Sequence, residues 1–172
     1  MMDIDKAAIK QWAVLVVDDD ADNREVARRL FSMFGAQVKT AENGKEGLQC
    51  LDEMTPTLIL LDISMPVMDG WEMLYILRNE REEDGLADVP VIALTAHAMA
   101  GDESRVMNAG FDGYITNPFN TRSLLQDVYA MVEGSDKTDN DDDDANPDKN
   151  GTPAQPGQPV MEGETHGQRK HA

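Results

Sequence analysis

The stretch from Leu58 to Gly70 reads Leu-Ile-Leu-Leu-Asp-Ile-Ser-Met-Pro-Val-Met-Asp-Gly. Its first four residues are apolar, which is typical of a strand buried on both faces of a parallel sheet. Asp62 follows directly, so its carboxylate is predicted to lie at the carboxyl end of that strand. Ligands bind at this edge of open α/β sheets, where an aspartate can serve as a nucleophile or a metal ligand.

A second apolar run ends in the same way. Residues 14–17 are followed by Asp18, Asp19 and Asp20. Carboxylates that meet at one edge of a parallel sheet repel one another unless a cation neutralises them, and oxygen ligands of this kind suit Mg²⁺. The sequence therefore predicts a metal-assisted acidic site that combines Asp62 with Asp18 and Asp19.

Five apolar runs alternate with helical patterns along the chain, as in an α/β fold whose parallel sheet is doubly wound, with helices on both faces. We expect strands at residues 13–18, 36–41, 57–62, 89–95 and 113–116. Helices are expected at residues 22–34, 44–54, from about 70 onward, 98–109 and 121–133, and residues 3–12 are open to a short additional helix.

Side-chain patterns predict what the helical segments do. Asp20 and Asp22 are expected to cap the first long helix. Its buried face is predicted from helical spacing to hold Val26, Leu30, Met33 and Phe34. Met73, Met99, Met107 and Met131 are likewise interpreted as packing residues. Residues 78–84 are interpreted as a solvated helix end and loop, and Cys50 as buried or half-buried.

Composition limits the partners and the location. The chain has 172 residues and a formal net charge of −18. Phosphate binding depends on Lys and Arg, so we expect no direct contact with nucleic acid or membranes. The single cysteine fits a reducing compartment, and neither a secretory signal nor an apolar stretch of the ~20 residues that a membrane span needs is visible. We expect a cytoplasmic protein.

Three regions are expected along the chain: an N-terminal extension at residues 1–11, one folded domain at 12–133 and an acidic tail at 134–172. The tail has almost no large apolar side chains, so it cannot offset the entropy of ordering and is predicted to be disordered. Its aspartates lack the Gly and Glu positions of a calcium-binding loop.

Two further strand ends carry polar groups. Thr95 closes the fourth predicted strand, where its hydroxyl can donate to a phosphoryl oxygen, and Ala96 leaves room for that group. Asn117 and Pro118 follow the fifth strand. Together with an aspartate nucleophile and Mg²⁺, these groups suit phosphoryl transfer best.

Over about residues 12–132 the chain resembles the receiver domains of two-component response regulators. The residues that match in order and spacing are Val16, Val17, Asp18, Asp19, Asp62, Met65, Pro66, Asp69, Gly70, Thr95, Ala96, Gly113, Tyr114, Pro118 and Phe119. The resemblance implies a flavodoxin-like fold, with five strands in the order 2-1-3-4-5 and five helices. Residues 93–101 are especially similar to stand-alone and hybrid-kinase receivers that work in phosphorelays.

The resemblance also implies site roles. Asp62 is implied as the residue that accepts a phosphoryl group from a sensor histidine kinase or a phosphotransfer protein. Asp19 is implied as the direct Mg²⁺ ligand, Asp18 as its water-mediated partner, and Ser64 as the donor of a backbone carbonyl ligand. Thr95 is similar to the residue that moves to bond the phosphoryl group.

At the fifth strand the resemblance implies that Tyr114 swings inward together with the threonine, forming a two-state switch. It also implies a cis peptide bond before Pro118. One position departs from the family, because Asn117 stands where a lysine is expected. A hydrogen bond to a charged group contributes about 1.5 to 3 kcal/mol, so a neutral amide could slow phosphorylation or uncouple it from the switch. Arg122 or His97 is a hypothetical substitute for the lost charge.

The leading interpretation is a single-domain response regulator that signals to a downstream protein target by direct contact. It is not expected to be an enzyme beyond self-phosphorylation and self-dephosphorylation. Asn117 leaves a second interpretation open, an interaction module that no longer responds to phosphate. An aspartyl hydrolase of the haloacid dehalogenase type is disfavoured, because its general acid would stand at Ser64.

Overall fold

A single parallel sheet forms the centre of the computed structural model, which describes residues 4–96 and 102–135. The strands are β1 (Ala13–Val17), β2 (Gln37–Ala41), β3 (Leu58–Asp62), β4 (Val91–Thr95) and β5 (Gly113–Thr116). All neighbours are parallel, and the order is β2-β1-β3-β4-β5. This is the fold class and the strand order that the resemblance implied.

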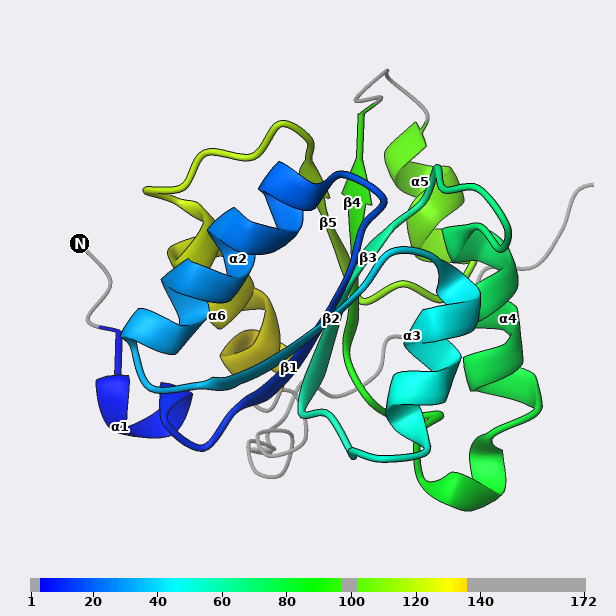
Figure 1. Ribbon diagram of the computed structural model, residues 1–172, viewed down its shortest axis with the longest axis horizontal. Helices are drawn as coiled ribbons and strands as arrows, with labels where there is room; N and C mark the ends of the chain where they lie inside the picture. Colours follow the sequence, from blue (N-terminus) through cyan, green and yellow to red (C-terminus); the bar gives the residue numbers. More distant parts are fainter. Residues whose placement is uncertain (1–3, 97–101, 136–172) are drawn as a thin grey trace, which may run out of the picture. The chain divides into compact units, whose positions relative to one another are not determined.

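Helices cover both faces of the sheet (Figure 1). They are α1 (Lys6–Ile9), α2 (Ala21–Met33), α3 (Gly44–Leu51), α4 (Gly70–Asn79), α5 (Asp102–Asn108) and α6 (Leu124–Ser135), with a short 3₁₀ helix, η1, at Glu82–Asp84. The additional short helix thus exists as α1. Residues 98–101, where we expected the fourth long helix to begin, lie outside the described residues, as do residues 136–172 of the expected tail.

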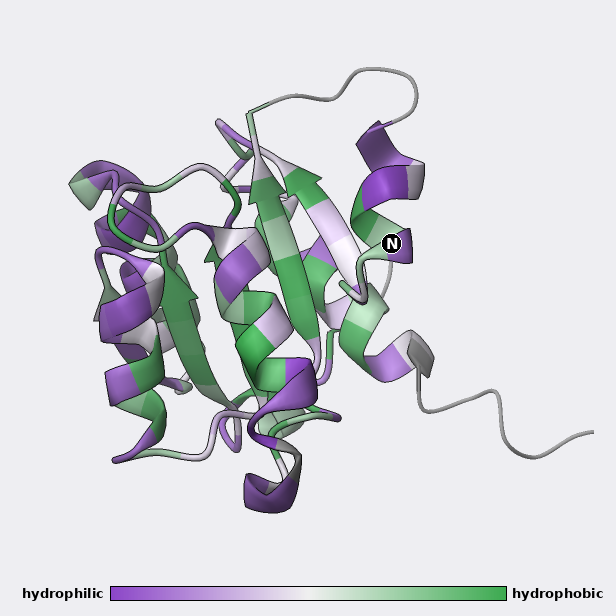
Figure 2. Ribbon diagram, turned by 90° about the vertical axis from the view of Figure 1, so that its right-hand side faces the viewer, coloured by the Kyte–Doolittle hydropathy of each residue, from purple (hydrophilic) through white to green (hydrophobic). Residues whose placement is uncertain are grey.

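Two apolar layers flank the strands. Side chains of α3, α4 and α5 pack on one face, and side chains of α1, α2 and α6 pack on the other. Figure 2 shows hydrophobic strands behind helices whose outward residues are hydrophilic. The four apolar residues that precede Asp62 are completely buried because both faces of β3 are covered. None of the described helices is both long and apolar enough to cross a membrane.

The strand register places the carboxylates. Val17 of β1 lies opposite Leu61 of β3, so Asp18 and Asp62 follow as neighbours at the same edge. Adjacent strands lie about 4.8 Å apart. Side chains that end neighbouring parallel strands are therefore close enough to interact directly.

The predicted buried face of α2 is wrong in part. Ala27 and Phe31 are fully buried, whereas 78% of Met33 is exposed. The helix begins at Ala21, and its buried stripe runs through positions 27 and 31, which are one turn apart. Leu30 and Phe34 flank that stripe and are half-buried. Val26, at 37% exposed, lies on the outer face.

The prediction that the methionines are packing residues is also correct only in part. Met73 is fully buried and Met131 packs against the core, as predicted. Met107 is 43% exposed and is not a core residue, because α5 turns Val106 inward instead. Met99 lies outside the described residues. Cys50 is half-buried, as expected.

Arg78 contradicts the prediction of a solvated stretch at residues 78–84. Its guanidinium donates to the backbone oxygens of Val89 at 2.9 Å and Gly110 at 3.2 Å, and to the Asp112 carboxylate at 2.8 Å. Arg81 pairs with Asp52 at 2.6 Å. The end of α4 is therefore tied to the segments that lead into β4 and β5.

Candidate functional site

Three carboxylates meet at the carboxyl edge of the sheet. Asp18 and Asp19 follow β1, Asp62 ends β3, and each offers an oxygen within 4.8 Å of the others. Asp18 is fully buried, Asp62 is 6% exposed, and Asp19 is exposed. The structure thus brings together the three aspartates that the sequence singled out.

The cluster is electrostatically unfavourable when all its groups are ionised. Burial, together with the charges of Asp18 and Asp19, raises the pKa of Asp62 to about 7, although a hydrogen bond from the Ser64 backbone acts in the opposite direction. Burial also raises the pKa of Asp18. A divalent cation among these oxygens would remove the repulsion. The donor set, made of carboxylate oxygens, fits Mg²⁺.

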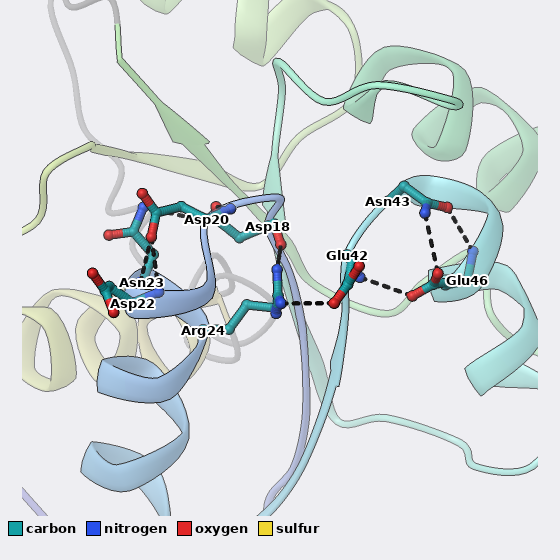
Figure 3. Close-up of polar contacts among 8 residues, drawn as sticks. All are labelled: Asp18, Asp20, Asp22, Asn23, Arg24, Glu42, Asn43 and Glu46. Carbon is teal, nitrogen blue, oxygen red and sulfur yellow. Dashed lines mark hydrogen bonds and ion pairs between the residues drawn. The ribbon is translucent and has the colours of Figure 1, made fainter.

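The α2 end of the site is held by a hydrogen-bond network (Figure 3). Asp18 Oδ1 accepts the backbone N–H of Asp20 at 2.8 Å. The backbone oxygen of Asp18 accepts from Arg24 at 2.7 Å, and Arg24 also pairs with Glu42 at 3.0 Å. Such contacts fix the direction in which a ligand presents its oxygens.

Asp20 caps α2, as predicted. Its carboxylate accepts the backbone N–H groups of Asp22 at 2.8 Å and Asn23 at 3.2 Å. Asp22 lies in the first turn, where a negative charge is favourable to the helix dipole. The Asp20 carboxylate therefore serves as the helix cap. Of the three consecutive aspartates, Asp18 and Asp19 are the ones in the acidic cluster.

The β3–α4 loop folds tightly around Asp62. The Ser64 backbone N–H donates to Asp62 Oδ1 at 3.1 Å, and the Gly70 N–H donates to the backbone oxygen of Ile63 at 3.0 Å. Asp69 caps α4 by accepting the Glu72 N–H at 2.9 Å. The cap explains the aspartate at position 69, and the Gly70 bond fixes the start of α4 against the end of β3.

Val67 is the strained residue of this loop. Its φ is 70°, and the Met68 N–H donates to the backbone oxygen of Pro66 at 2.8 Å, which makes a γ-turn. The Met68 carbonyl in turn accepts the Gly44 N–H at 3.0 Å. The turn thereby joins the loop to the start of α3.

Thr95 lies at the same edge as Asp62 and is 8% exposed. Its neighbour Leu94 is opposite Asp62 in the sheet. Thr95 and Ser64 both line a cavity of about 260 Å³, and the Arg105 guanidinium, which also lines it, lies 4.9 Å over the Trp71 ring. Thr95 thus borders an open volume at the edge of the sheet where Asp62 lies.

Tyr114 lies half-buried on β5, opposite Ala93. Its hydroxyl hydrogen-bonds with Glu103, and that carboxylate holds the pKa of the phenol above its usual value. In this structure the ring is therefore linked to α5. A rearrangement of Tyr114 would need that bond to break.

Asn117 is held on two sides. Its backbone N–H donates to the Thr95 oxygen at 2.7 Å, and its side-chain Oδ1 accepts from Asn23 Nδ2 at 3.2 Å. The peptide bond before Pro118 is cis, as the resemblance implied. Sequence reasoning missed Asn23, although its place one turn into α2, five residues after Asp18, was the available signal.

The hypothesis of a substitute charge finds no support at Arg122. This residue is exposed, its backbone N–H donates to Asn120 Oδ1 at 2.9 Å, and within the described part of the chain its side chain forms no ion pair with the three aspartates. His97 lies outside the described residues.

Comparison with known proteins gives several sequence relatives. An uncharacterized 14.6 kDa protein of Leptolyngbya boryana is 37% identical over 118 residues, which are 69% of this chain and 88% of that protein. The polar-differentiation response regulator DivK of Brucella anthropi is 34% identical over 120 residues, covering 70% and 95% of the two chains. The sensor protein GacS of Pseudomonas syringae is 35% identical over 115 residues, 67% of this chain but only 13% of that protein.

Solved structures share the fold. The chemotaxis response regulator CheY4 of Vibrio cholerae has a TM-score of 0.63 at 27% identity, covering 70% of this chain and 98% of its own. A chain in the co-crystal structure of the yeast phosphotransfer protein Ypd1 with the receiver domain of Ssk1 has a TM-score of 0.66 at 25% identity, covering 74% and 93%. The family model of the response regulator receiver domain matches residues 14–129, which include the three aspartates and all five strands except Ala13, the first residue of β1. This chain therefore belongs to the response regulator receiver domain family.

Proposed function

We propose that this receiver domain accepts a phosphoryl group on Asp62 from a phosphohistidine of a sensor kinase or a phosphotransfer protein. The observation that carries the proposal is the position of Asp62, which is buried beside Asp18 and Asp19 with its pKa raised to about 7. A carboxylate in such a place is destabilised unless a cation or a covalent modification relieves it.

The site residues have distinct tasks in this proposal. Asp19 would bind Mg²⁺ directly, Asp18 would bind it through water, and Asp62 and the Ser64 carbonyl would complete the protein ligands. When bound, Mg²⁺ supplies positive charge for the phosphoryl oxygens and favours the ionised form of Asp62. The Ser64 N–H, which donates to Asp62 Oδ1, holds the acceptor in one orientation.

The transfer itself is a displacement at phosphorus. A carboxylate oxygen of Asp62 forms the new P–O bond while the P–N bond to the donor imidazole breaks, and the imidazole leaves as the neutral ring once it is protonated. Thr95 would then donate its hydroxyl to a phosphoryl oxygen. In this proposal the chain acts as a signalling module and not as an enzyme that turns over a small substrate.

Output would follow from the switch residues. Movement of Thr95 toward the phosphoryl group would alter the connection between β4 and α5, and the hydrogen bond between Tyr114 and Glu103 would break. We propose that a downstream protein reads this change by direct contact with α5, β5 and α6. The relatives support the upstream part of the proposal, the phosphoryl donor, since GacS is a sensor protein and the Ssk1 receiver was crystallised with a phosphotransfer protein.

One observation favours a second function. Asn117 places a neutral amide where the family resemblance implies an ammonium group, and a point charge binds phosphoryl oxygens more strongly. The alternative is an interaction module that keeps the fold and binds its partner without phosphorylation.

Intact-mass spectrometry distinguishes phosphorylation of Asp62 from the phosphate-independent interaction module. The purified protein is incubated with Mg²⁺ and phosphoramidate beside two matched variants, Asp62→Asn and Asp88→Asn, the latter at an exposed aspartate after η1. We expect one added phosphoryl group in the parent protein and in Asp88→Asn, and none in Asp62→Asn. An unmodified parent protein would favour the phosphate-independent module.

A further inference from the structure

One asparagine, Asn23, joins the acidic cluster to Asn117, which lies 94 positions further along the chain. The Nδ2 group of Asn23 donates to Asp18 Oδ2 and to Asn117 Oδ1, each at 3.2 Å. The Asn23 backbone is itself fixed, because its N–H donates to the capping Asp20. The side chain therefore spans from the acidic cluster to the position of the missing lysine.

The donors and acceptors in this chain of contacts fix the orientation of both amides. Asp18 accepts a backbone N–H on its other oxygen, so it acts as an acceptor. Asn23 must then present its NH₂ group to Asp18, and the second hydrogen of that group reaches Asn117. The atom of Asn117 that faces Asn23 is consequently the carbonyl oxygen. Its NH₂ group is the end left for another partner.

We propose that Asn23 is a positioning residue that aims the NH₂ group of Asn117 at the phosphoryl group on Asp62. This inference rests on the proposed function. Asn117 lies at the correct edge, because its backbone N–H is bonded to the Thr95 oxygen at 2.7 Å. Its two amide hydrogens can bond phosphoryl oxygens, although without the charge of an ammonium group. Asn23 and Asn117 together would therefore replace the single lysine that the family resemblance implies at position 117.

The pairing has a consequence for restoring that lysine. An ammonium group only donates hydrogen bonds, so it cannot accept from the Asn23 NH₂ group. In Asn117→Lys alone, the ammonium group and the Asn23 NH₂ group would be two donors facing each other. The alternative is that the Asn23 amide turns its oxygen toward the lysine, which breaks its hydrogen bond to Asp18. Removing the Asn23 side chain takes away this conflict. The lysine should therefore work better in the variant that also carries Asn23→Ala.

A double-mutant cycle tests the inference. The variants are Asn23→Ala, Asn117→Ala and their combination, with Asn79→Ala as a matched helix-surface control whose amide donates to the Tyr75 carbonyl at 2.8 Å. The rate of phosphoryl addition from phosphoramidate is measured at saturating Mg²⁺, and Mg²⁺ affinity is measured separately. Each single variant should be roughly tenfold slower, the loss of one charge-assisted hydrogen bond. The combination should be no slower than Asn117→Ala, since Asn23 acts through Asn117.

Lysine variants give an independent readout. Asn23→Ala/Asn117→Lys should react several-fold faster than Asn117→Lys, and Asn23→Leu, which is similar in volume but has no donor, should reproduce the effect of Asn23→Ala. The inference would be overturned if the rate losses of the two single variants multiplied in the combined variant, or if the two lysine variants reacted at equal rates. The proposed function would still stand in either case. A parent protein that gains no phosphoryl group would instead overturn the proposed function, and this inference with it.

Discussion

The backbone of Gly70 lies directly against the backbone of Asp62. A Cβ atom built on Gly70 would overlap the carbonyl oxygen of Asp62 and lie 2.8 Å from Cα of Ile63. These neighbours are main-chain atoms of the β3 end, so they cannot turn aside as a side chain does. The glycine therefore allows the start of α4 to approach Asp62.

Gly70→Ala should consequently lower the free energy of unfolding by about 1 to 3 kcal/mol, the usual cost of overpacking. It should also weaken Mg²⁺ binding, because the β3–α4 loop must shift. Urea titration and a Mg²⁺ titration measure the two effects. Gly134→Ala is the matched control, since nothing lies within 4 Å of a Cβ there and the residue is in α6. We expect that variant to gain up to about 1 kcal/mol.

Val67 should be replaceable with a gain in stability. It is 77% exposed and has a φ of 70°, a conformation that a β-branched residue adopts only under strain. Val67→Asn should raise the free energy of unfolding by roughly 0.5 to 1 kcal/mol, because asparagine tolerates this region. Thermal unfolding would show it. Val26→Asn, the same exchange on the outer face of α2, should not stabilise, and a loss at Val67 would contradict the strain argument.

The stability of the metal-free protein should depend on pH through Asp62. Its pKa is about 7 in the folded protein against an ordinary value of 3.8, so the folded state holds the proton more tightly. The free energy of unfolding should therefore fall as pH rises from about 4 to about 7, and stay low above that. Asp62→Asn should remove most of this fall, leaving the part that comes from the raised pKa of Asp18. Its free energy of unfolding should exceed that of the parent protein at pH 8 by about 1 to 3 kcal/mol.

Urea titrations at pH 5.5 and pH 8 in the presence of a chelator provide the measurement. Added Mg²⁺ should stabilise the parent protein more at pH 8, where Asp62 is ionised, and should stabilise Asp62→Asn much less. An unchanged pH dependence in Asp62→Asn would show that other groups cause it.

Arg24 should affect metal binding without touching the metal. Arg24→Lys keeps the charge but loses the planar fork that bonds both the Asp18 carbonyl and Glu42. We expect Mg²⁺ affinity to fall several-fold, toward the tenfold that supporting contacts around metal ligands commonly contribute. Isothermal titration compares this variant with Arg28→Lys, whose parent side chain pairs with Glu25 on the helix surface. Equal affinities for the two variants would exclude a positioning role for Arg24.

Much of the fold was predictable because its signals are local. The apolar run before Asp62 and the run before Asp18 each specify a buried strand, and a parallel sheet sends both carboxyl ends to one edge. The direction of the α2 face was not predictable in detail. Met33 and Phe31 are both apolar, and only the helix start and its packing on the sheet decide that Phe31 is buried while Met33 is exposed.

The doubly wound sheet, and the position of Asp18, Asp19 and Asp62 at the carboxyl ends of its strands, follow from the sequence alone, since strand periodicity and the position of a residue after its strand are properties of short segments. The tertiary structure alone decided that Asn23 bridges Asp18 and Asn117, and that Arg78 joins α4 to the segments before β4 and β5. Those contacts depend on strand order and loop paths, which bring together donors and acceptors from distant parts of the chain.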